Sequence, residues 1–143
     1  MVAIQRFFLR GVINMLYELR IYEPVEGKTE AVHEAFEKLK PVAERHGVNP
    51  IAIWETPIEA DLEATLTRSP LENAHHEIGK NKKYIIYLVA FKNLEDRKRA
   101  WTDFRSDPEV KEIILPIKER EGGDIEAKIT NFLLNPASYS PIQ

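Results

Sequence analysis

The chain has 143 residues, of which 43% are hydrophobic and 30% charged, with a formal net charge of −3 and no cysteine. This length and balance predict one globular domain, and the acidic charge argues against non-specific nucleic-acid binding, which needs a basic surface. Without cysteine there is no disulfide, no thiolate nucleophile and no cysteine-bound metal. No run of 18 apolar residues occurs, so we expect no membrane span and a cytoplasmic protein.

The first 14 residues, "MVAIQRFFLRGVIN", carry two arginines and no acidic residue. Arg6 and Arg10 interrupt the apolar run that an export signal requires, and the serines usual in a mitochondrial presequence are missing. Met15 is the only methionine after the first residue. We therefore expect residues 1–14 to be an N-terminal extension (an arm, a targeting piece or an upstream start) and residues 15–143 to form a single domain.

The stretch "MLYELRIYEP", residues 15–24, has the alternation of a strand. We expect one side of this strand to pack on helices and the other side, which carries a carboxylate next to a guanidinium, to face away from them. The first set is Tyr17, Leu19 and Ile21, and the second is Leu16, Glu18, Arg20 and Tyr22.

A helix is predicted over residues 28–46, where apolar residues recur at helical spacing, with Gly47 as its stop. Pro41 lies inside this pattern and predicts a kink or an early break. The stretch "NPIAIWET", residues 49–56, is typical of a second strand. The connection that follows, residues 57–83, is long for a small domain, and such connections are often functional.

The stretch "YIIYLVAF", residues 84–91, is apolar on both sides and predicts a central strand. Asn93 is a plausible N-cap for the next helix, and "SDPEV" restarts a helix with Asp107 as N-cap and Pro108 at its first position. After the Gly-Gly break, residues 124–134 alternate as a fourth strand.

The resulting order, β-α-β-β-α-β, is that of the ferredoxin-like split βαβ fold, an α+β class with one four-stranded antiparallel sheet and both helices on one face. The other face would then expose an apolar patch too large for a monomer. A second copy is the economical cover, so we expect a homodimer whose two sheets close into a dimeric α/β barrel. The residues expected on that patch are Leu16, Tyr22, Trp54, Phe132 and Leu134.

Three segments in order, "MLYELRIYEPVEGK", "NLEDRKRAWTDFRSDPEV" and "FLLNPASYSP", resemble NIPSNAP-domain proteins over residues 15–141. The resemblance implies a dimeric α+β barrel and a first-strand signature of Glu18, Arg20 and Tyr22, with Trp54 as an aromatic of strand two. Residues 57–83 depart from the family, which commonly has a shorter link there. The family's wider relatives include cofactor-independent monooxygenases, haem-degrading oxygenases and isomerases that use the barrel cavity as their site, but fold similarity does not transfer chemistry.

The candidate site residues have two interpretations each. Glu18 and Arg20 either anchor a ligand carbonyl or carboxylate, or form an ion pair that orders the barrel. Tyr22, Trp54 and Tyr87 either line a pocket for a flat apolar molecule or pack in the core.

Other chemistry finds little support in the sequence. "HHE", residues 75–77, is the only local histidine cluster, and adjacent side chains rarely chelate one ion well. There is no GxSxG nucleophile context and no glycine-rich phosphate loop. We therefore expect no metal and no cofactor.

The leading functional hypothesis is a homodimer that binds a small, partly apolar molecule in its cavity. One alternative is a cofactor-independent monooxygenase or isomerase, with Glu18 or a histidine as general base. Another is a scaffold in which residues 57–83 or the N-terminal extension recruit a partner.

Overall fold

The computed structural model of the protein describes residues 15–56 and 83–143, and the expectations for residues 1–14 and 57–82 lie outside these ranges. The elements follow the predicted order, with the second helical segment divided in two. They are strand β1 (Leu16–Pro24), helix α2 (Thr29–Arg45), strand β2 (Pro50–Glu55), strand β3 (Ile85–Phe91), helix α4 (Leu94–Ser106), helix α5 (Pro108–Glu121) and strand β4 (Glu126–Leu134).

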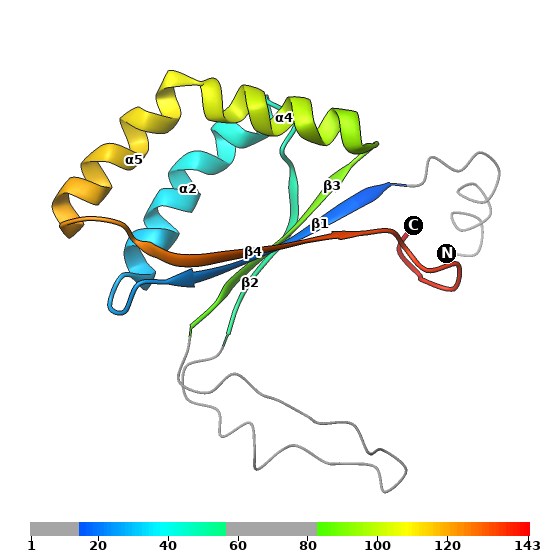
Figure 1. Ribbon diagram of the computed structural model, residues 1–143, viewed down its shortest axis with the longest axis horizontal. Coiled ribbons are helices and arrows are strands. Elements are labelled where there is room, and N and C mark those ends of the chain that lie inside the picture. The colour runs from blue at the N-terminus through cyan, green and yellow to red at the C-terminus, as the bar shows by residue number, and fades with distance from the viewer. Residues whose placement is uncertain (1–14, 57–82) are drawn as a thin grey trace, which may run out of the picture.

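The four strands form one antiparallel sheet in the order β2-β3-β1-β4. All three helices lie on one face of this sheet, as Figure 1 shows, and the described chain places no helix on the other face. The α+β ferredoxin-like fold class predicted from the sequence is confirmed. We call the two faces of the sheet the helix side and the open side.

The helix ends agree with the sequence signals. The Asn93 side chain accepts a hydrogen bond from the backbone N–H of Asp96, and Asp107 caps α5 through the N–H of Glu109. The early break expected at Pro41 is wrong, because α2 continues through this residue to Arg45. Val42 and Ala43 are buried directly after the proline, and this packing holds the last turn of the helix in place.

The core lies between the helices and the sheet in two clusters, one toward each end of β3. Tyr87, in the middle of β3, packs against both clusters. The first cluster contains Tyr22, Ala31, Val32, Ala35, Ile85, Ile117 and Ile125, and the second contains Ala43, Val48, Val89, Phe91, Ala100 and Trp101.

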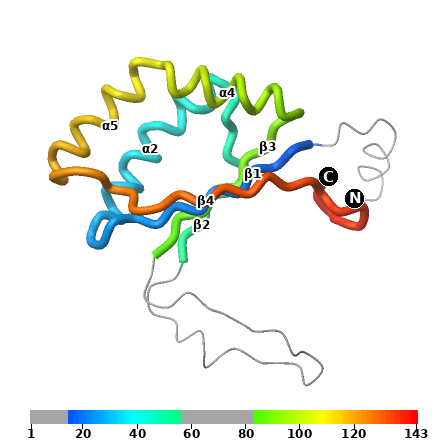
Figure 2. The backbone as a smooth tube through the Cα atoms, viewed as in Figure 1, coloured from blue at the N-terminus to red at the C-terminus, as the bar shows by residue number. Residues whose placement is uncertain are grey.

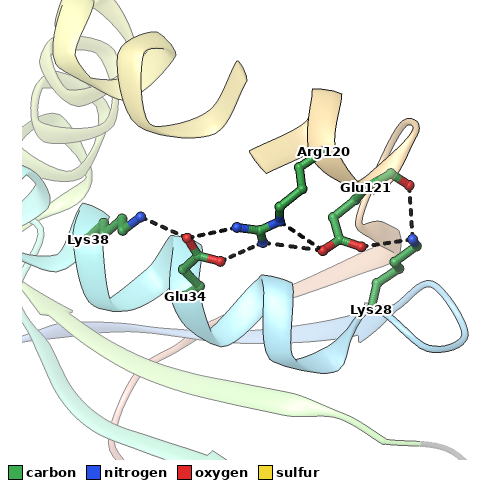
Figure 3. A network of polar contacts seen from close by, with 5 residues as sticks. All are labelled: Lys28, Glu34, Lys38, Arg120 and Glu121. Carbon is green, nitrogen blue, oxygen red and sulfur yellow. Dashed lines mark hydrogen bonds and ion pairs between the residues drawn. The ribbon is translucent and has the colours of Figure 1, made fainter. Parts of the chain in front are cut away.

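On the outer surface, a network of charges joins α2 to α5 (Figure 3). Arg120 Nη2 donates to Glu34 at 2.6 Å, and Lys28 Nζ donates to Glu121 at 2.9 Å. At the other end of the molecule, residues 135–143 fold back after β4 (Figure 2). Among the described helices, none is long and apolar enough to cross a bilayer.

Candidate functional site

The polar residues of β1 lie on the helix side, between the two apolar clusters. Arg20 pairs with Tyr87 across β3, whereas Glu18 pairs with Val89 and Tyr22 with Ile85, which belong to different clusters. Residues directly opposite each other in an antiparallel pair share a face. The polar cluster therefore interrupts the core at its centre.

Glu18 is the best-satisfied member of this cluster and is completely buried. Its Oε2 accepts hydrogen bonds from Arg97 Nε at 2.9 Å and from Arg97 Nη2, and its Oε1 accepts one from Trp101 Nε1 at 2.8 Å. Arg20 Nη1 lies 3.6 Å from the same Oε1. Because both oxygens are occupied by donors, Glu18 is arranged to hold α4 against β1 rather than to take a proton from a substrate.

Arg20 is also buried, with 6% of its surface exposed, but the described residues do not use all of its donors. Its Nε donates to the Tyr22 hydroxyl at 2.8 Å, and its guanidinium lies 4.4 Å from the centroid of the Trp101 ring. With the Asn131 amide turned so that its oxygen faces this group, Nη1 donates to it at 3.3 Å. Nη2 has no hydrogen-bond partner within residues 15–56 and 83–143.

Three aromatic rings continue the site from Arg20 toward α2. Tyr22 and Tyr87 have ring centroids 5.3 Å apart, and Phe36 of α2 packs on both, at 4.7 and 4.8 Å. Burial raises the pKa of Tyr22 and of Tyr87 above the ordinary tyrosine value. Both phenols therefore keep their protons at neutral pH and are available as hydrogen-bond donors.

Strand β4 closes the sheet beside Arg20, and its helix side is left uncovered. Asn131 pairs with Arg20, and its neighbours on the same side are Ile129 and Leu133. These two apolar side chains are 43% and 48% exposed, although they point to the face that carries the helices. The buried guanidinium of Arg20 thus adjoins an exposed apolar stripe, which we call the β4 stripe (Ile129, Asn131 and Leu133).

The open side has a different chemistry. Along β1, Tyr17, Leu19 and Ile21 point to it, and their partners on β3 are Ala90, Leu88 and Ile86. The partners on β4 and β2 add Leu134, Phe132, Thr130, Ala52 and Trp54. None of these side chains is charged, and Trp54, Phe132 and Leu134 are 51%, 49% and 39% exposed.

Residues 135–143 cover one corner of the open side. The Tyr17 hydroxyl donates to the Gln143 carbonyl oxygen at 2.7 Å, and an apolar pocket of about 490 Å³ lies there, lined by Tyr17, Leu88, Leu134 and the tail. A second pocket, of about 670 Å³, lies at the turn between β1 and α2 and is lined by Glu23, Glu26 and Glu30 among others.

The predicted facing of β1 is wrong. Glu18, Arg20 and Tyr22 point toward the helices, and Tyr17, Leu19 and Ile21 point to the open side. The reason is that α4 supplies an arginine and an indole N–H, which satisfy a buried carboxylate better than a bare apolar surface does. The structure therefore brings Tyr87 together with Arg20 and Tyr22, and it places Trp54 on the opposite side of the sheet.

Three residues of the cluster are absent from the predicted site: Arg97, Trp101 and Asn131. Arg97 and Trp101 are four residues apart, so they share one face of α4, and this spacing is the signal that points to them. Asn131 is an amide in the middle of an apolar strand. No group of three or more metal-ligating side chains lies together in the described parts of the chain, and the histidine pair at residues 75–76 falls outside them.

The fold, with its buried polar cluster, places the protein in the class of ferredoxin-like α+β proteins. Similarity to known proteins indicates a family within this class. Residues 71–141, about half of the chain, match the family model described as NIPSNAP. This match confirms the resemblance to NIPSNAP proteins that the sequence predicted. No curated protein matches the chain in sequence.

Solved structures agree with this fold. A NIPSNAP family protein of unknown function from Agrobacterium tumefaciens is similar with a TM-score of 0.64 and 21% identity, over 92% of this chain and 96% of that one. A NIPSNAP-like domain protein from Burkholderia xenovorans gives 0.59 and 20%, over 90% of each chain. A second Agrobacterium tumefaciens family protein gives 0.63 and 18%, over 90% of this chain and 99% of that one.

Proposed function

We propose that this NIPSNAP-family protein is a homodimer that binds a small, partly apolar molecule against the helix side of its sheet. The observation that carries the proposal is the β4 stripe. Its two apolar side chains are nearly half exposed, and the buried Arg20 beside them has an N–H donor with no partner among the described residues. Apolar surface with a few convergent polar groups is the usual composition of a small-molecule site.

The homodimer is supported by the open side. This face is apolar and uncharged from Tyr17 to Ile21 and exposes two aromatic rings, Trp54 and Phe132. Such a patch is unusual on a monomer, and sheets pack well face to face. A second copy is the occupant we propose, because the same face on both chains gives a closed, two-fold interface.

Two consecutive residues of β4 separate the two parts of the proposal. Phe132 lies on the open side and Leu133 on the helix side, with 49% and 48% of their surfaces exposed. Phe132→Asp should turn the dimer into a monomer on a sizing column at micromolar concentration. Leu133→Asp should leave the dimer intact. A wild-type protein that elutes as a monomer contradicts the dimer.

Ligand binding can be followed through the indole signals of Trp101 and Trp54, which lie on opposite sides of the sheet. In a proton–nitrogen correlation spectrum, 4-phenylbutanol should shift the indole signal of Trp101, which lies against Arg20, and Trp54→Phe assigns the two signals. Leu133→Asp should abolish this shift. A shift confined to Trp54 would place the molecule on the open side and refute the helix-side site.

A further inference from the structure

The charges around Arg20 identify the kind of molecule that the helix side takes. We infer that the ligand is an apolar monocarboxylate whose carboxylate is held by Arg20 and Tyr22 and whose apolar body lies along the β4 stripe. This inference rests on the proposed function, because it specifies the ligand of the same site.

One carboxylate serves two guanidinium groups at the centre of the cluster. Arg97 takes Glu18 with two of its donors, and Trp101 takes the other oxygen. Arg20 is left with a 3.6 Å approach to that second oxygen. A buried guanidinium with a shared counter-ion is expected to favour a second anion.

The other charges that face Arg20 do not replace this anion. The Glu126 carboxylate interacts electrostatically with Arg20, but it accepts no hydrogen bond from Arg20, and burial raises the pKa of Glu126. Arg105 adds another positive charge over the Trp101 ring, 5.6 Å from its centroid. Tyr22 and Asn131 are neutral.

Arg20 and Tyr22 offer donors of the kind that bind a carboxylate. Arg20 Nη2 has no hydrogen-bond acceptor among the described residues, and the Tyr22 hydroxyl, which accepts from Arg20 Nε, can donate its own proton. A guanidinium with a neighbouring hydroxyl can donate to both oxygens of a carboxylate. An alcohol has a single oxygen and therefore uses these donors only in part. A ligand ammonium would meet like charge.

The apolar part follows from the register of β4. Asn131 stands opposite Arg20, and Ile129 and Leu133 stand on either side of it on the same face. Residues two apart on a strand are about 7 Å apart. A ligand whose carboxylate binds Arg20 therefore finds apolar surface for the rest of the molecule in either direction along the strand. A short chain ending in a ring fits this span.

The test compares three molecules of one shape: 4-phenylbutyrate, 4-phenylbutanol and 4-phenylbutylamine, titrated calorimetrically into the full-length protein at pH 7. The acid should bind about tenfold more tightly than the alcohol, a difference of about 1.4 kcal/mol, and the amine least tightly. The acid should shift the Trp101 indole signal and leave that of Trp54 in place.

Three variants keep the result interpretable. Tyr22→Phe, which removes only a hydroxyl, should weaken the acid several-fold and leave the alcohol unchanged. Arg20→Met should make acid and alcohol equal, with the circular dichroism spectrum and the sizing column reporting that it still folds. Phe132→Asp, on the open side, should leave the preference for the acid unaltered.

The outcomes distinguish this inference from the proposed function. If alcohol and acid bind equally and Leu133→Asp abolishes both, the helix-side site stands and the carboxylate preference is wrong. If none of the three molecules moves the Trp101 signal, the proposed ligand site falls as well. A preference for the acid that survives Arg20→Met in a folded protein also overturns the inference.

Discussion

The two sides of strand β1 show how one short segment serves two opposite purposes. Toward the helices it carries Glu18, Arg20 and Tyr22, which are buried and hydrogen-bonded to residues of α4 and to each other. Toward the open side it carries Leu19 and Ile21, which make no polar side-chain contact and lie among uncharged residues of the neighbouring strands.

The difference teaches that burial and polarity need not exclude each other when the covering element brings its own donors. An unpaired carboxylate in a core is costly, but Glu18 receives donors from both Arg97 and Trp101. Around Leu19 and Ile21 the described part of the open side offers no such partners and is apolar instead. A surface of that kind is covered by another apolar surface, which is why a second copy of the chain suits it.

The strongest way to break the helix side is Glu18→Gln. The substitution removes the negative charge and leaves the buried Arg20 and the partly buried Arg97 with no other counter-ion in contact among the described residues, so we expect a loss of about 3–5 kcal/mol in the free energy of unfolding. Urea unfolding followed by circular dichroism measures this change. Glu55→Gln is the matched control, because Glu55 is exposed and among the described residues pairs only with His33, and it should cost less than about 0.5 kcal/mol.

A loss below about 1 kcal/mol for Glu18→Gln would contradict this account of the cluster. Such a result would mean that both arginines are hydrated in solution. The polar cluster would then not be what holds α4 on the sheet.

A second test compares the two sides within β1 by removing one hydroxyl from each. Tyr22→Phe takes away the acceptor of a buried arginine N–H, so we expect a loss of about 1.5–3 kcal/mol. Tyr17→Phe removes a bond to the Gln143 backbone on the open side, and a neutral bond of this type is worth about 0.5–1.5 kcal/mol. Urea midpoints of the two variants, measured in parallel, decide the order.

Equal losses for the two tyrosines would show that the charge of Arg20 adds nothing to its bond with Tyr22. A larger loss for Tyr17→Phe would show that the tail on the open side is held more firmly than the centre of the core.

The order of the elements could be predicted from the sequence because each has a local signal. Asn93 and Asp107 are N-caps in the structure as predicted, and the apolar run of β3 marks it as an inner strand. Alternation also sorts Glu18, Arg20 and Tyr22 correctly onto one side of β1. These signals act within a few residues of the chain.

Which side of the sheet the helices cover is not a local property. It depends on the contact of Glu18 with α4, about 80 residues away in the chain. Alternation along β1 separates its two sides but does not say which side the helices cover. The usual rule that charges face away from a core favours the wrong side here. For the same reason the sequence predicts Trp54 on the same side as Tyr22, whereas the structure places them on opposite sides. The side of Tyr87 is set by its pairing with Arg20, which the sequence does not show.

The smallest expected effect is on the pH dependence of stability, and it comes from the surface network of Figure 3 rather than from the buried cluster. Hydrogen bonds from Arg120 and then from Lys38 lower the pKa of Glu34 to about 2, from an ordinary value of 4.5. A pKa lowered by folding stabilises the protein above the unfolded value, and the stabilisation is lost as the pH falls from 4.5 toward 2. Glu34→Gln should therefore lose less stability across this window than the wild type does.

Urea midpoints at pH 6, 4.5, 3.5 and 2.5 measure this slope, and 1 M sodium chloride should reduce the difference because the network is exposed. Glu112→Gln is the control, since Glu112 is an exposed residue of the same helix as Arg120 and has no ion pair in the parts of the chain that the structure describes. Its acid slope should match that of the wild type. If the acid slope of Glu34→Gln also equals that of the wild type, this carboxylate adds no measurable stability to the contact between α2 and α5. Apolar packing under the helices would then be what joins them.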